Sequence, residues 1–374
     1  MMGISLSWPS GLEWLAVIPL LSVLVFVHEL GHFLAAILVK VRVEEFGFGY
    51  PPRALVLFER NGVKFTLNWL PFGGFVRMAG EEQGSEDPGS LASKAPWQRF
   101  IVFAAGSTMN VLLAILIYTV VFAGGTPEYT GRMVVGDVAP GSPAAAAGLQ
   151  PNDILVRIGE QETDSFDSVS SATNAVLGRE TTVIVERDGA EVAVQLVPRS
   201  PEERPAGQGA LGITITLDEP VGVRHHSVSL PTAFSLGLQR VAFLFTAMAE
   251  GLGRLILSPV LPSVEAPEGG VSGPVGIARL AGEAAQMGWV TFLDLGAFLS
   301  LNFALINALP LPALDGGHIV FVILEWLRRG KKVPPQKEAL VHLAGMMLLI
   351  GLMVVVSYLD VVRWIQGGSA IPGG

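Results

Sequence analysis

Residues 14–39 read WLAVIPLLSVLVFVHELGHFLAAILV, an apolar run whose polar members are Ser22, His28, Glu29 and His32. A helix rises 1.5 Å per residue, so this run is long enough to cross the roughly 30 Å of hydrocarbon in a bilayer. Ionisable side chains are costly to place in such a helix and usually mark a functional site. We therefore predict a membrane-spanning helix that carries reactive groups.

Three further stretches resemble the first in length and character, at about 100–123, 289–309 and 339–362. Hydrophobic residues make up 50% of the chain and charged residues only 15%. The mean hydropathy is +0.52. This balance is typical of a polytopic membrane protein. We expect a polytopic α-helical protein with four transmembrane helices.

A fifth apolar stretch, residues 231–261, is interrupted by Gln239, Arg240, Glu250 and Arg254. A fifth span is one interpretation. The four interruptions and the Pro-rich stretch that follows favour helices that lie on the outer membrane face.

The Lys and Arg residues predict the orientation, because cytoplasmic connections carry an excess of them. Basic residues gather in the first connection (40–99) and in the last, at Arg328, Arg329, Lys331, Lys332 and Lys337. Both connections should be cytoplasmic, with the segment from about 125 to 285 and both termini outside. The net charge of −9 falls largely in that outer segment. This acidic charge argues against a nucleic-acid partner. The apolar spans make the lipid bilayer the expected partner.

The first connection is more than a loop. Residues 63–69 (VKFTLNW) alternate apolar and polar side chains as a strand does, and glycines punctuate the region. We predict a small β region over about 43–78 that lies against or dips into the membrane. Residues 80–96 are acidic and rich in Gly and Ser, which predicts a surface loop.

Residues 131–198 are typical of short strands with Gly and Asp turns. VAPGSPA (138–144) and AGLQPNDIL (147–155) resemble a PDZ domain, with a helix over Ser142–Ala147 followed by a turn and a strand. Such domains bind extended peptides by adding a strand to a sheet edge; a domain that only fills space is the alternative. We predict an inserted α+β PDZ domain.

These features divide the chain into four parts. The first membrane half covers 1–125, and the PDZ-like domain with its Pro-rich linker (199–210) covers 126–210. An outer-face interfacial segment covers 211–285, and the second membrane half covers 286–374.

His28 and His32 are four residues apart, so both imidazoles fall on one helix face and can bind one metal ion, with Glu29 beside them. The chain has no cysteine, so the ligands must be His, Asp or Glu. Zinc suits such ligands, ionises water near neutral pH and polarises a carbonyl group. Glu29 is the expected general base. The alternative is a helix end with snorkelling polar groups.

A third ligand must come from elsewhere. Candidates in or beside the spans are Asp294, Asp315, His318, Glu325, His342 and Asp360. His28 and His32 lie in the cytoplasmic half of their helix, and this depth retains Asp315, His318 and His342. Asp315 is favoured because the Pro-Leu-Pro break before it can turn a side chain toward a central site; His342 stays open as the alternative.

NFALINALPLPALDGG (302–317) resembles the Leu-Asp-Gly region of the site-2 protease family of intramembrane zinc metalloproteases. LPFGGFVRM (70–78) is similar to the β region of that family, and GPVGI (273–277) is similar to another recurrent segment. A single PDZ-like insertion resembles the bacterial branch that includes RseP and RasP. GSTMN (106–110) departs from it, because relatives usually have Gly-Pro and then Asn.

The resemblance implies that His28, His32 and Asp315 bind Zn²⁺, that Glu29 is the catalytic base, and that Asn302 and Asn307 lie near the substrate. It also implies regulated intramembrane proteolysis in the bacterial inner (cytoplasmic) membrane, with the PDZ-like domain extracytoplasmic. The expected substrates are single-span membrane proteins, such as an anti-sigma factor or similar regulator, already trimmed by another protease.

Two other functions use the same residues. A non-catalytic scaffold would have lost a ligand or the base, and all four positions are intact. A zinc transporter would need a polar path, and the second span offers only Ser107, Thr108, Asn110 and Thr119.

Overall fold

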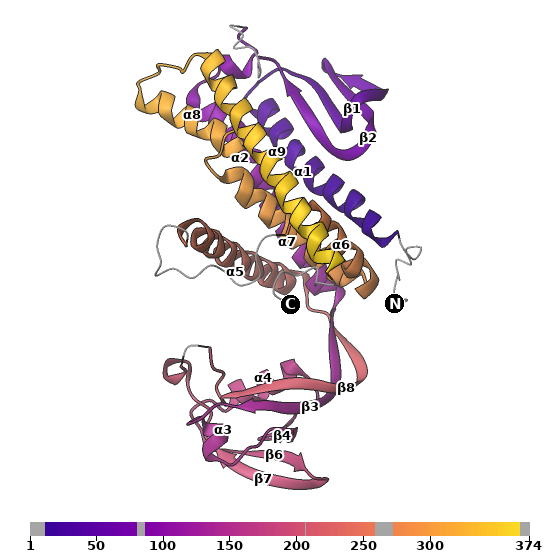
Figure 1. Cartoon of the computed structure of the whole chain (residues 1–374), viewed down its shortest axis with the longest axis vertical. Helices are drawn as coiled ribbons and strands as arrows, with labels where there is room; N and C mark the ends of the chain where they lie inside the picture. The colour runs from indigo at the N-terminus through magenta and orange to yellow at the C-terminus, as the bar shows by residue number, and fades with distance from the viewer. Residues whose placement is uncertain (1–11, 81–86, 206, 259–271, 367–374) are drawn as a thin grey trace. The chain divides into compact units, whose positions relative to one another are not determined.

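The computed structural model describes residues 12–80, 87–205, 207–258 and 272–366. The chain forms two compact units, and residues 124–227 are inserted between the two parts of the other unit (Figure 1). Some sequence predictions fall outside the described residues. They concern both termini (1–11 and 367–374), part of the acidic loop (81–86) and the Pro-rich stretch within 259–271.

The motif-bearing span is present as helix α1 (Val17–Leu38), preceded by a short 3-10 helix, η1 (Glu13–Ala16). Three more predicted spans are the helices α2 (Pro96–Gly124), α7 (Trp289–Ala308) and α9 (Pro335–Ile365). Leu24 of α1 is almost completely buried in a cluster with Leu20, Ala281 and Leu299. Interlocking apolar side chains therefore hold α1 inside the bundle.

The apolar segment after the inserted unit is one helix, α5 (Leu230–Leu257). Together with it, five helices in the described part of the chain are long and apolar enough to span a membrane, so the count of four is not confirmed. The interruptions weigh less than expected because Arg240 is the only charged residue between positions 230 and 249. Val241 of α5 packs against Tyr118 of α2 and Leu301 of α7. In Figure 1, α5 runs across the direction of α1 and α9.

The described part of this unit also contains two shorter α-helices. Helix α6 (Pro274–Met287) contacts η1, α7 and α9, and its first turn is held by Asp360 of α9, whose Oδ2 accepts the Gly276 N–H at 2.9 Å. Helix α8 (Asp315–Leu327) follows the turn after α7. Its buried Glu325 forms an ion pair with Arg99 of α2. The two shorter helices therefore anchor the second half of the chain to the first.

The β region is present as strands β1 (Val43–Arg60) and β2 (Val63–Met78), joined by an Asn61-Gly62 turn. Both strands bend, so that Phe46 pairs with Phe65 on one side and with Val76 on the other, while Phe58 also pairs with Phe65. The sheet order is the end of β2, the start of β1, the start of β2 and the end of β1. The last segment of β2 is consequently one edge of the sheet.

The sheet has a buried and an exposed end. Phe46 and Met78 pack with Phe33 of α1 and with Val102 of α2 in one core. At the other end Leu57, Phe58 and Trp69 are exposed, Trp69 to 71%. Such apolar exposure suits contact with lipid, as expected for a membrane-associated β region.

The inserted unit is an antiparallel sheet of six strands in the order β7-β6-β4-β3-β8, with β5 paired to β4. The strands are β3 (Thr126–Val138), β4 (Ile154–Ile158), β5 (Gln161–Glu162), β6 (Thr181–Arg187), β7 (Ala190–Leu196) and β8 (Ile213–His226). A short 3-10 helix, η3 (Pro201–Glu203), lies in the predicted linker. Because β8 pairs with β3, the compact unit continues to residue 227, beyond the predicted domain end at 210.

Two helices cover this sheet, α3 (Pro143–Ala146) and α4 (Phe166–Ala175). Helix α3 matches the helix expected over Ser142–Ala147, and the Ser142 hydroxyl caps it by accepting the Ala145 N–H at 3.1 Å. Buried Met133 and Val185 lie in the core of the unit. The unit thus has its own apolar core and its own helix caps.

Candidate metal centre

Helix α1 presents His28 and His32 on one face, and both residues are buried, with exposed fractions of 7% and 6%. Their Nε2 atoms lie 3.2 Å apart. Two histidines four residues apart have side chains about one helical turn from each other, which explains the convergence. The local sequence alone therefore builds two corners of a metal site.

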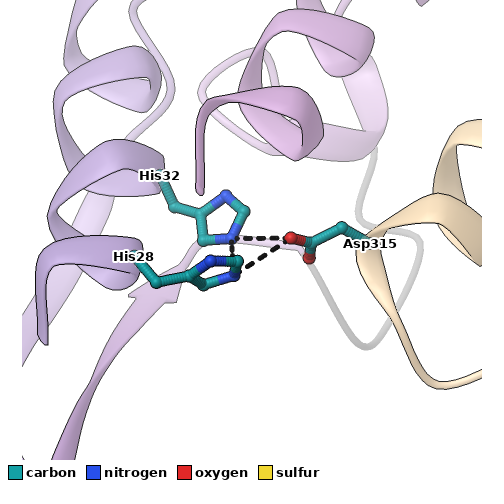
Figure 2. A group of neighbouring side chains, drawn as sticks. All are labelled: His28, His32 and Asp315. Atoms are coloured by element: carbon teal, nitrogen blue, oxygen red, sulfur yellow. Dashed lines mark hydrogen bonds and ion pairs between the residues drawn. The ribbon is translucent and has the colours of Figure 1, made fainter. Parts of the chain in front are cut away.

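Asp315 supplies the third corner from the first residue of α8 (Figure 2). Its Oδ2 lies 3.0 Å from His28 Nε2 and 3.3 Å from His32 Nε2. The three side chains come from segments almost 300 residues apart along the chain. They form one group of potential metal ligands.

The dimensions of this group fit a zinc ion. Tetrahedral zinc with bonds of about 2.0–2.1 Å places its ligand atoms about 3.3–3.4 Å apart, and the three atoms here are separated by 3.0, 3.2 and 3.3 Å. Gly106 of α2 faces the group, and a Cβ atom there would lie 2.5 Å from His32 Nε2 and 2.6 Å from His28 Nε2. The glycine leaves free the space that an ion needs.

Helix α2 also orients both imidazole rings. His32 donates its Nδ1–H to the Val102 carbonyl oxygen at 2.8 Å, which leaves Nε2 free to bind a metal. His28 Nδ1 lies 3.3 Å from the side-chain nitrogen Nδ2 of the fully buried Asn110. A half-turn of this amide would present its oxygen, which can accept the Nδ1–H of a metal-binding His28. The backbone carbonyl oxygen of Asn110 accepts a hydrogen bond from the Ser300 hydroxyl of α7 at 2.8 Å.

Glu29 stands next to the ligand group but outside it. Its Oε2 accepts the backbone N–H of Val76 in β2 at 3.1 Å. The edge segment of the sheet thus holds the carboxylate in place beside the two histidines. A carboxylate that is near a metal site and not among its ligands can accept a proton from water.

The chain is similar to known proteins along most of its length. A model of the peptidase family M50 matches residues 16–352. Three relatives carry the name "Putative zinc metalloprotease". That of Fusobacterium nucleatum is 32% identical over 94% of this chain and 98% of its own length. Those of Agrobacterium fabrum and Clostridium perfringens are 32% and 34% identical, each over 91% of this chain and over 93% and 96% of their own lengths.

The chain belongs to peptidase family M50. The expected family is thereby confirmed, and the protein is a zinc metalloprotease with several long apolar helices compatible with a membrane. The scaffold and the zinc transporter are set aside.

The M50 protease brings together only some of the residues singled out from the sequence. His318 and His342 stack on each other away from the ligand group, and Asp360 is bonded to Gly276. Asn302 of α7 donates a hydrogen bond to the Phe298 carbonyl oxygen of its own helix at 3.1 Å. Among the described residues, neither Asn302 nor Asn307 is hydrogen-bonded to His28, His32 or Asp315. Their place near substrate stays a prediction.

The sequence alone predicts no metal-site role for Gly106 or Asn110 of this M50 protease. They are the Gly and the Asn of the GSTMN segment. The signal in the sequence is that Asn110 follows Gly106 by four residues in a span whose other polar residues are Ser107, Thr108 and Thr119. Residues four apart share a helix face, and this face of α2 covers the ligand group.

Proposed function

We propose that this M50 protease hydrolyses peptide bonds within the transmembrane segments of membrane-tethered proteins. The observation that carries the proposal is the group of buried His28, buried His32 and half-buried Asp315 inside a bundle of helices long and apolar enough to span a membrane. Ionisable groups at such a depth are functional by default. A substrate that reaches them must itself be in the membrane.

His28, His32 and Asp315 would hold the zinc ion. When bound, zinc polarises a scissile carbonyl and favours the ionisation of water near neutral pH. Glu29 accepts the proton of the attacking water and passes it to the leaving amine. The Val76 N–H fixes one carboxylate oxygen of Glu29 and leaves the other available for this transfer.

A peptide bond in a transmembrane helix is protected because its backbone is already hydrogen-bonded and water is absent. The substrate must therefore unwind near the site. The end of β2 is a sheet edge whose Val76 N–H points to Glu29, so a substrate strand added along this edge would pass the catalytic base. Asn302 and Asn307 would satisfy backbone groups that the unwinding frees.

We further propose that the inserted unit is a PDZ-like domain on the extracytoplasmic side of a bacterial inner membrane, with α5 lying along the outer face. The basic residues in the first connection (40–99) and in the last (Arg328 to Lys337) support this orientation, because cytoplasmic connections carry an excess of them. The unit would screen access, so that membrane-tethered regulators such as anti-sigma factors enter after another protease has trimmed them.

The test is a cleavage assay in liposomes with a panel of single-span substrates, comparing wild type with Glu29→Gln. The exposed Glu180→Gln is the matched control. We expect Glu29→Gln to lose about 100- to 10,000-fold in kcat, the usual range for a general base, while zinc content stays the same and Glu180→Gln behaves as wild type. Mass spectrometry should place the cut inside the substrate's apolar segment. Unchanged turnover, or cuts confined to soluble loops, would contradict the proposal.

A further inference from the structure

The turn between α7 and α8 carries Asp315 and has an uncommon backbone. Ala313, two residues before the aspartate, has φ +74°. This left-handed region disfavours any residue with a Cβ atom, so surrounding contacts must hold Ala313 in it. The position of Asp315 depends on those contacts.

Helix α9 provides them. His342 Nδ1 accepts the Ala313 N–H at 2.9 Å. Nearly one helical turn further on, Gly345 lies so close to Pro312 that a Cβ atom would be 2.3 Å from Pro312 Cβ and 2.8 Å from its carbonyl oxygen. His342 and Gly345, on one face of α9, therefore hold Ala313 and Pro312 of the turn in place.

The His342 ring is itself held in place. It stacks on His318 of α8 with ring centroids 3.9 Å apart and an interplanar angle of 15°. His318 in turn stacks on Phe103 of α2, at 4.8 Å and 9°. This three-ring stack fixes where the His342 acceptor atom points.

His318, His342 and Glu338 also bring three potential metal-binding atoms within 4.8 Å of one another. The stacking argues against that role. The lone pairs of an imidazole lie in the plane of its ring, so two nearly parallel rings cannot both direct one at the same ion. Moreover, His342 Nδ1 already accepts the Ala313 N–H.

We propose that His342 is a positioning residue for the zinc site: by accepting the Ala313 N–H it fixes the turn that places Asp315 against His28 and His32. The inference rests on the proposed role of Asp315 as a ligand. It assigns α9 a task in the reaction although α9 supplies no ligand. Outer partners of this kind typically change metal affinity by about 10- to 100-fold when they are lost.

Two amide substitutions and one aromatic substitution separate the possible roles of this residue. His342→Asn keeps an acceptor near the position of Nδ1, whereas His342→Gln carries the same amide one carbon further out. His342→Phe keeps the ring stack and has no acceptor. Zinc affinity, by chelator competition, and kcat and KM are measured on the full chain, with size-exclusion profiles to identify folded protein.

We expect His342→Gln and His342→Phe to lose about 10- to 100-fold in zinc affinity, with lower kcat and little change in KM, and His342→Asn to remain within threefold of wild type. If Phe retains wild-type affinity, or if Asn loses as much as Gln, the proposal is overturned. Should Phe not fold, the comparison of Asn with Gln decides alone. Asp315→Asn is measured in parallel: if it leaves zinc binding unchanged, the ligand assignment has failed rather than the role of His342.

Discussion

Gly106 is the residue on which the space for a metal ion depends. It belongs to α2 and faces the Nε2 atoms of His28 and His32, with a hydrogen atom where other residues carry Cβ. Asn110 and the Val102 carbonyl on the same helix orient the two rings. A helix that contributes no ligand therefore sets both the room and the ring geometry of the site.

Gly106→Ala should exclude zinc without unfolding the bundle, because its methyl group would fall 2.5–2.6 Å from both ligand nitrogens. We expect a loss of at least about tenfold in zinc affinity and a matching loss of cleavage. Metal content by mass spectrometry is the measurement, and Thr108→Ala is the control, since the exposed Thr108 side chain donates a hydrogen bond to the Ala104 carbonyl oxygen of its own helix. Full zinc occupancy in Gly106→Ala would show that the ion lies elsewhere.

The inserted unit has an ion pair with a buried carboxylate, and this pair links the stability of the unit to pH. Asp153 is 1% exposed, and Arg187 donates to its two carboxylate oxygens, each at 2.7 Å. Burial acts to raise the pKa of Asp153, but the bonds from Arg187 and from the Gln150 N–H outweigh it and hold the pKa below its ordinary value. A lowered pKa stabilises the fold above the ordinary pKa of about 4, and this contribution is lost as pH falls through the folded value.

Arg187→Met should therefore destabilise the inserted unit by about 3 kcal/mol at pH 7, because it leaves a buried carboxylate unpaired. The deficit should shrink below pH 4, where Asp153 takes up a proton. Hydrogen exchange of the Val183 and Val185 amides in the full chain measures the unfolding free energy of the unit at each pH. A deficit that does not change with pH would mean that the pair acts through packing alone.

At the scale of elements, the bent pair β1 and β2 connects Glu29, the proposed catalytic base, to the exposed apolar end of the sheet. Glu29 is tied to Val76 at one edge, while Leu57, Phe58 and Trp69 are exposed at the far end. No ligand comes from the sheet, so its contribution to cleavage and its contribution to zinc binding can be separated.

Thr66→Pro tests that separation. Thr66 is buried and pairs with Gly47 on one side and Val56 on the other, so a proline there removes a ladder hydrogen bond from the centre of the sheet. We expect cleavage to be abolished while zinc content persists. Asn61→Gly is the control, because Asn61 has φ +53° in the hairpin turn and glycine accepts that conformation. Unchanged cleavage in Thr66→Pro would exclude a role of the sheet in presenting substrate.

At the scale of the whole molecule, the inserted unit can be removed where it joins the bundle. The two junctions lie side by side, since the Val228 N–H donates to the Phe122 carbonyl oxygen at 3.4 Å. A short Gly/Ser link from residue 123 to residue 228 should therefore close the membrane unit without strain.

This deletion should leave zinc binding intact and admit substrates whose outer domains have not been trimmed. The readout is the ratio of cleavage rates for trimmed and untrimmed forms of one single-span substrate, which should move toward one. The control is wild-type protein carrying the same link as an insertion next to Asp188, in an exposed turn of the unit. If the shortened enzyme remains as selective as wild type, the screening role is wrong.

The sequence by itself determined what depends on neighbouring residues. Hydropathy over about twenty residues located α1, α2, α7 and α9, and a four-residue spacing paired His28 with His32. Alternation over residues 63–69 predicted the β region. These features are local because helical and strand periodicities repeat within a few residues.

Only the tertiary structure decided what depends on contacts between distant segments. Asp315 and His342 were both open as third ligand, and the turn after α7 places Asp315 at the histidines while His342 holds that turn from α9. The roles of Gly106 and Asn110 depend on how closely α2 approaches α1. The physical reason is that no periodicity encodes these approaches: they follow from the packing of whole helices, which fixes side chains hundreds of residues apart to within an ångström.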